Sequence, residues 1–129
     1  MLEPFAEPLG LLVAVEYPYR PFPENEVWGA DVACVRLSRH EATDKWLMGS
    51  PELVIEVKSP SNTKHELHDK AMTMLAGEGA VEFWIVDAAS ASVTVYSKTS
   101  GVHVYRATEM VPVPLLECQI DLSALFAAD

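Results

Sequence analysis

Short apolar runs separated by turn residues recur along the chain, and the first of them occupies positions 11–15 (Leu-Leu-Val-Ala-Val). A run of this length that is rich in branched residues predicts a strand. Three prolines follow within 17–23, which excludes a helix and favours an extended edge segment or a loop. A second apolar run at 31–35 begins with Asp31, and the polar stretch 38–50 predicts a loop.

The run 53–58 (Leu-Val-Ile-Glu-Val-Lys) predicts a central strand, because it is apolar and a Ser-Pro-Ser turn follows it. Side chains alternate between the two faces of a strand. We therefore expect Leu53, Ile55 and Val57 on one face, and Val54, Glu56 and Lys58 on the other. Charges are costly to bury unless they are paired with each other or with a metal. The second face of this strand is therefore the first candidate for chemistry.

The spacing of apolar residues changes to a helical period after Pro60. Thr63 and Glu66 have the spacing of a capping box, in which each side chain bonds to the backbone N–H of the other residue. One apolar face follows, made of Leu67, Ala71, Met74 and Leu75. Gly77 and Gly79 are expected to end the helix.

Strands are predicted at 81–87, 92–97 and 102–106, and consecutive members of this set should be antiparallel. The strands 53–58 and 81–87 are joined by a helix, which favours a right-handed parallel crossover. Pro112 and Pro114 break the chain again, and 121–126 predicts a short helix capped by Asp121. These elements indicate one α/β domain, 1–129, with a mixed sheet and one main helix.

Composition narrows the class of protein. Half of the 129 residues are apolar, which argues against disorder. No apolar run approaches the roughly 20 residues of a membrane span, and the residues before position 11 lack the positive charge of a signal peptide. Cys34 and Cys118 lie in apolar runs, so we expect buried free thiols in a reducing cytoplasm, with a disulfide as the alternative.

The net charge of −10 opposes nucleic-acid binding, which depends on Lys and Arg neutralising phosphates. The charge is uneven, however. Six of the nine basic residues lie between positions 36 and 70, together with six acids, so this stretch is neutral while both flanks are acidic.

Asp31, Glu56 and Lys58 form an Asp…Glu-x-Lys pattern on two predicted strands. Mg²⁺ prefers hard oxygen ligands, usually one or two carboxylates with waters and substrate phosphate. Two carboxylates on adjacent strands could supply them, with the carbonyl of Val57 as a third protein ligand. Lys58 could then orient the attacking water or stabilise charge on the phosphate.

Longer segments carry a resemblance to a known family. They are the run from Asp31 to 35, the segment 52–63 (Glu-Leu-Val-Ile-Glu-Val-Lys-Ser-Pro-Ser-Asn-Thr), the pair Asp69-Lys70, and 79–87 (Gly-Ala-Val-Glu-Phe-Trp-Ile-Val-Asp). Together they resemble the Uma-type putative restriction endonucleases of the PD-(D/E)xK nuclease superfamily. The resemblance extends over roughly 11–126.

The resemblance implies a restriction-endonuclease-like α/β core, a divalent cation (Mg²⁺ or Mn²⁺) and cleavage of DNA. It implies that Asp31 and Glu56 are metal ligands, that Lys58 is the catalytic lysine and that Lys70 faces phosphate. Two departures stand out, since Ala30 replaces a proline that is frequent in the family and the chain begins almost at its first strand. The second departure predicts an N-terminally shortened form.

Less specific interpretations remain open beside this one. Glu56 and Lys58 can form a plain surface ion pair, Asp31 can simply begin a strand, and Lys70 can be a solvated helix residue. His65 and His68 share a helix face but lack a third soft ligand, so we expect them to be exposed. The functional alternative is an inactive or weakly active nuclease-fold module that self-associates, as a homodimer, or binds a partner.

Overall fold

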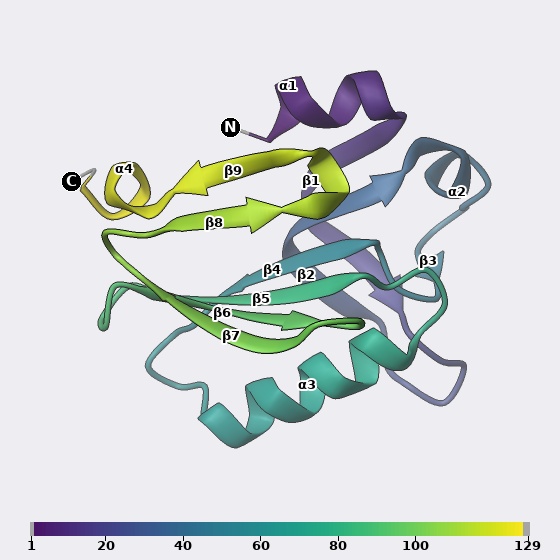
Figure 1. The fold of residues 1–129 in the computed structure, drawn as a ribbon. Helices are drawn as coiled ribbons and strands as arrows, with labels where there is room; N and C mark the ends of the chain where they lie inside the picture. The colour runs from purple at the N-terminus through teal and green to yellow at the C-terminus, as the bar shows by residue number, and fades with distance from the viewer. Residues whose placement is uncertain (1, 128–129) are drawn as a thin grey trace.

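The computed structural model describes residues 2–127, which form a large mixed sheet with helices on both of its faces (Figure 1). Its seven strands have the order β3 (Leu47–Met48), β1 (Leu11–Arg20), β2 (Trp28–Arg36), β4 (Leu53–Val57), β5 (Glu82–Asp87), β6 (Ser92–Ser97) and β7 (Gly101–Arg106). The β4–β5 and β1–β3 pairs are parallel and the other neighbours are antiparallel. The expected mixed sheet, the parallel crossover and the two later hairpins are confirmed.

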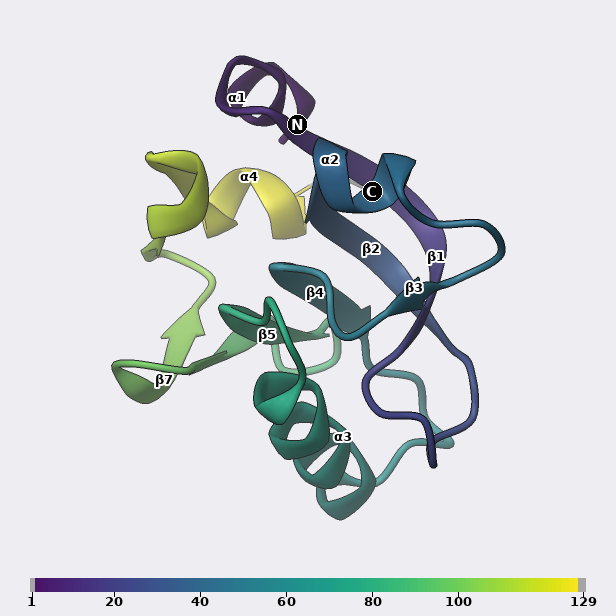
Figure 2. The ribbon, with the colours of Figure 1, turned by 90° about the vertical axis from the view of Figure 1, so that its right-hand side faces the viewer.

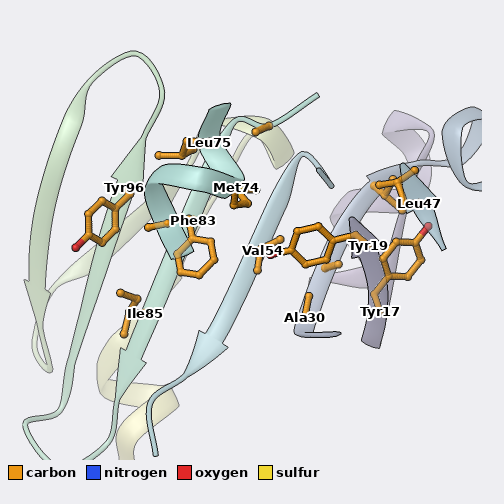
Figure 3. Packing of buried hydrophobic residues seen from close by; sticks show 14 of the residues in the cluster. Tyr17, Tyr19, Ala30, Leu47, Val54, Met74, Leu75, Phe83, Ile85 and Tyr96 are labelled. Atoms are coloured by element: carbon orange, nitrogen blue, oxygen red, sulfur yellow. The ribbon is translucent and has the colours of Figure 1, made fainter. Parts of the chain in front are cut away.

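Helix α3 (Lys64–Ala76) connects β4 to β5 and covers one face of the sheet. Its capping box is formed. The N–H of Glu66 donates to Thr63 Oγ1 and the N–H of Thr63 donates to Glu66 Oε1, and each donor–acceptor distance is 3.1 Å. The predicted apolar face is buried, with Leu67, Ala71, Met74 and Leu75 as its members. They pack on residues of the sheet such as Val54 and Phe83 (Figure 3).

A second core lies on the opposite face of the sheet. It includes Leu53 and Trp84, and it is covered by a two-stranded sheet of β8 (Met110–Val113) and β9 (Cys118–Asp121). The 3-10 turn η2 (Pro114–Leu116) joins these strands, and α1 (Glu3–Ala6), η1 (Glu7–Leu9) and α4 (Leu122–Ala127) flank them. Figure 2 shows α1 and α4 on the side of the sheet away from α3. The faces predicted for Leu53 and Val54 are therefore confirmed.

Three segments differ from the sequence-based expectations. Strand β1 continues through Pro18, because its outer side is paired only by the two residues of β3, and a proline is tolerated where the neighbouring strand is missing. The stretch 38–50 is not only a loop, since it contains most of α2 (Leu37–Glu41) and all of β3. Pro112 lies within β8 and does not break it, because both strands of a two-stranded sheet are edges.

The structure also tests the expected cap of the last helix and the state of the two cysteines. The N–H of Ser123 donates to Asp121 Oδ1 over 3.0 Å, which confirms the predicted cap of the last helix. Both cysteines are free thiols, with Cys34 buried and Cys118 half-buried. Among residues 2–127, no helix is long and apolar enough to cross a membrane.

Candidate functional site

Asp31 lies where the side-chain alternation of the sheet is interrupted. Ala30 and Ala33 both contact the core beneath α3, although residues three apart on a regular strand face opposite sides. The neighbouring strand is irregular at the same level, where Glu16 has a φ of 48° and the β1–β2 register omits Glu16 and Asp31. The irregularity therefore takes Asp31 out of the β1–β2 ladder.

The carboxylate of Asp31 replaces a ladder partner at the end of β4. Pairing between β2 and β4 ends at Val32 and Ile55, and Asp31 Oδ2 accepts a hydrogen bond of 2.7 Å from the N–H of Val57. The N–H and C=O groups of one strand residue point to the same side. The carbonyl of Val57 is therefore directed towards β2 as well, beside Asp31.

Glu56 is buried beneath α3, with only 7 % of its surface exposed. Lys70 reaches it from the helix, and Lys70 Nζ lies 3.1 Å from Glu56 Oε2 and 5.4 Å from the centre of the Trp28 ring. Glu56 Oε2 is therefore held by an ion pair with Lys70, and no other donor reaches this buried oxygen in the part of the chain that the structure describes. Trp28, Glu56 and Lys70 line one cavity of about 470 Å³.

The pKa of Glu56 is raised, which indicates that this ion pair does not fully compensate for its burial. Burial raises the pKa of Glu56 above its usual value, the ammonium of Lys70 lowers it, and the adjacent carboxyl of Asp31 raises it again by charge and by side-chain hydrogen bonding. Two carboxyl groups in contact cannot both ionise easily unless a proton or a cation lies between them. The pair Asp31–Glu56, of which Glu56 has the ammonium of Lys70 as its partner, therefore fits a hard divalent cation.

Tyr19 provides a second unsatisfied oxygen close to this pair. Its side chain is fully buried in the core beneath α3, and Figure 3 shows its ring directed towards Val54 of β4. Among the residues that the structure describes, Tyr19 Oη and Glu56 Oε2 are the buried side-chain oxygens without a hydrogen-bond partner. Burial, and secondarily the negative charge of Glu56, raise the pKa of Tyr19.

Lys58 lies on the helix-covered side of the sheet but in a neighbouring cavity of about 320 Å³. Leu67 lines both cavities. The charge of Lys58 acts on Asp87, whose pKa is lowered first by a hydrogen bond from Ser90 and to a lesser extent by Lys58. Asp31, Glu56 and Lys70 are therefore brought together, and Lys58 is set to one side of them.

The interpretation of Lys70 as a solvated helix residue is wrong. Its side chain is only 26 % exposed and pairs with Glu56, because α3 lies on the face of the sheet from which Glu56 projects. His65 and His68 are exposed as expected, and they face Asp69 and Tyr96 respectively. Within residues 2–127, no group of three or more His, Cys, Asp or Glu side chains is arranged to hold a metal ion.

Comparison with known families assigns the chain. The model of the Uma2 family, described as putative restriction endonuclease, matches residues 1–124. The chain belongs to the Uma2 family. Comparison with curated proteins gives no match. Among solved structures, a putative nuclease belonging to DUF820 from Anabaena variabilis is 19 % identical, with a TM-score of 0.80 over 98 % of this chain and 74 % of that chain.

The Anabaena structure shows that this Uma2 protein has a nuclease-like fold, and membership of the family supports a nuclease function. Sequence reasoning on the Uma2 protein overlooked Tyr19 and undervalued Lys70. No sequence signal marked Tyr19, which follows a proline in a segment expected to be irregular. Lys70 was marked only by its resemblance to a recurrent basic position, because contact between a helix and the strand beneath it is a tertiary property.

Proposed function

We propose that the protein is a divalent-metal-dependent endonuclease that hydrolyses phosphodiester bonds of DNA, with Asp31, Glu56 and Lys58 as its catalytic residues. One observation carries the proposal. The buried carboxyl of Glu56 lies beside that of Asp31 at the edge of a cavity, with the ammonium of Lys70 as its one cationic partner among the described residues. Membership of the Uma2 family supports the same activity.

Asp31 and Glu56 would hold Mg²⁺ or Mn²⁺, with the carbonyl of Val57 as a third protein ligand. When bound, such an ion polarises a phosphate oxygen and lowers the pKa of a coordinated water. The chain contributes the placement of both carboxylates, because the N–H of Val57 holds Asp31, and the position of Glu56 in β4 together with Lys70 holds Glu56.

Two lysines have separate roles in this proposal. Lys58 approaches the scissile phosphate from the neighbouring cavity and stabilises the charge that develops on its oxygens. Lys70 balances the charge of Glu56 before a cation binds, and its ammonium can then turn to a phosphate oxygen. The stacking of Lys70 on Trp28 limits the directions that this side chain can take.

Incubation with supercoiled DNA and Mg²⁺ or Mn²⁺ tests the proposal. We expect nicked and linear products, and a loss of at least about 100-fold in rate for Glu56→Gln and Lys58→Met. Lys98→Met is the matched control, because Lys98 is exposed in the turn between β6 and β7, and it should cut normally. Cutting that persists undiminished in Glu56→Gln would show that a contaminant is responsible.

An alternative function is a catalytically inactive module that self-associates or binds a partner. The ammonium of Lys70 already neutralises Glu56, and exposed Val102 and Val104 lie on the edge strand β7, where a second copy could add to the sheet. Calorimetry separates the two functions. Binding of Mn²⁺ that is lost in Asp31→Asn supports the nuclease, and a homodimer that binds no Mn²⁺ at millimolar concentration supports the module.

A further inference from the structure

A basic groove lies beside the candidate metal site. It is the cavity of about 320 Å³ described above, and its charged lining consists of Lys58, Lys64, Arg106 and Asp87. The whole chain has nine basic residues and a net charge of −10, so three of nine cations gather where only one acid lines the wall. The local field in the groove therefore opposes the sign of the protein as a whole.

The sheet arranges part of this groove as a row across its strands. Asp87 pairs with Ser92, Ser92 pairs with Arg106, and the N–H of Lys58 donates to the carbonyl of Val86, next to Asp87. Three strand spacings of about 4.8 Å separate Lys58 from Arg106, which amounts to about 14 Å. The hydroxyls of Ser90 and Ser92, which also line the groove, add hydrogen-bonding groups between the two cations.

The cations of the groove are free to bind an anion. Among the residues that the structure describes, Lys58, Lys64 and Arg106 make no ion pair within 4 Å. Asp87 is engaged in its own turn, since its Oδ1 accepts a hydrogen bond of 3.1 Å from the N–H of Ala89. Arg39 differs from these cations, because its guanidinium is paired with Glu52 over 2.8 Å.

We propose that this groove binds the phosphodiester backbone of the nucleic acid next to the scissile phosphate, with Lys64 and Arg106 as phosphate-binding residues. The inference rests on the proposed nuclease function, because it takes the substrate from there. Successive phosphates of one DNA strand are about 3.4 Å apart along the helix axis. A row of about 14 Å therefore spans about four nucleotide steps. Lys58 then marks the catalytic end of the row and Arg106 its far end.

A binding experiment in EDTA tests the groove without cleavage. A short fluorescent DNA duplex is titrated with the wild type, with Lys64→Gln/Arg106→Gln and with the control Lys45→Gln/Lys98→Gln, which changes the net charge equally at exposed sites outside the groove. We expect the groove variant to bind at least about tenfold more weakly. Its salt dependence should fall by about 1.8 in the slope of log K against log salt, for two lost phosphate contacts.

Equal weakening in both double variants would overturn the inference, because a general charge effect would then explain the binding. Absence of binding by the wild type at low salt would overturn it as well. All four substituted side chains are exposed, and thermal melting checks that the variants remain folded. If only the groove variant loses DNA binding and the wild type does not cleave DNA in Mg²⁺, the groove proposal is supported and the nuclease proposal is rejected. The two proposals can therefore fail separately.

Discussion

Two buried glutamates at the two ends of β4 have the same chemistry and different surroundings. Glu52 is 3 % exposed and precedes the strand, and Glu56 is 7 % exposed and lies within it. Both oxygens of Glu52 have hydrogen-bond donors. Its Oε1 accepts from the N–H of Arg36 over 3.0 Å, and its Oε2 accepts from Arg39 Nη1 over 2.8 Å. Glu56 has a neighbouring carboxyl and, over residues 2–127, a single cationic partner, Lys70, whose Nζ lies 3.1 Å from Oε2.

The surroundings of Glu52 are built to hold its partner in place. The guanidinium of Arg39 also donates to the carbonyl of Glu78 over 3.0 Å. Gly79 leaves the space for this side chain, because a Cβ there would collide with the guanidinium, and its φ of +94° is one that other residues rarely adopt. The whole arrangement connects β4, α2 and the turn after α3.

The comparison teaches that burial alone does not identify a functional carboxylate. A buried charge with a complete set of donors fixes the fold, whereas a buried charge that remains incompletely paired is available for a cation or a substrate. We therefore assign a structural role to Glu52, and the proposed catalytic role belongs to Glu56. The predictions below test this difference, beginning with the largest effect.

Removal of the partner of Glu52 should unfold the protein most readily. Arg39→Met leaves a buried carboxylate without its main donor, and we expect the free energy of unfolding to fall by about 3–5 kcal/mol. Urea denaturation followed by circular dichroism measures it. Arg36→Met is the matched control, because the side chain of Arg36 is 57 % exposed and its Nε lies 3.7 Å from Glu52. The control should change stability by less than about 1 kcal/mol, and an equal effect of both variants would contradict the structural role.

A divalent cation should stabilise the Glu56 end of β4. At a free Mn²⁺ concentration 100 times its Kd, a cation that binds only the folded state adds about 2.7 kcal/mol to the free energy of unfolding. Asp31→Asn should abolish this increase, and Asp44→Asn, which removes an exposed acid in the loop before β3, should retain it. The measurement is urea denaturation with Mn²⁺ and with EDTA. The same increase in both variants would show that Mn²⁺ binds elsewhere.

The parts of the fold that the sequence predicts are those set by local patterns. Alternation along 53–57 places Val54 and Glu56 on the helix side, and the Thr63–Glu66 box begins α3, because both patterns depend only on nearby residues. Strand β3 is not predicted, because it has two residues and pairs with β1, which is distant in the chain. The β8–β9 pair is not predicted, because both strands are short and β8 contains a proline.

The candidate site also has one part that local patterns predict and another that depends on tertiary packing. The resemblance and the strand pattern predict Asp31 and Glu56 as site residues, and the influence of Asp31 on the pKa of Glu56 places the two carboxyl groups near each other. The position of Lys70 over Glu56 depends on the angle at which α3 crosses the sheet, which periodicity does not specify. Lys58 lies one residue beyond the end of β4 and lines the basic groove. Its position depends on the residue at which the strand ends, which the alternation of side chains does not specify.

The smallest effect should be a dependence of stability on pH that belongs to Glu56 alone. Burial and Asp31 raise the pKa of Glu56 above its ordinary value of 4.5, so the folded state holds this proton more tightly than the unfolded state does. The stability contributed by Glu56 is therefore fully present below pH 4.5 and is lost as the pH rises through the raised pKa. Glu56→Gln lacks this loss.

Without metal, the free energy of unfolding of Glu56→Gln minus that of the wild type should increase with pH across this window and then become constant. Urea denaturation at a series of pH values measures the difference, with Glu24→Gln as an exposed control whose difference should stay flat. Lys70→Gln should move the window to higher pH, because the ammonium is the charge that lowers the pKa of Glu56. A difference that decreases with pH would mean that Glu56 is as well compensated as Glu52, and the distinction between the two ends of β4 would be lost.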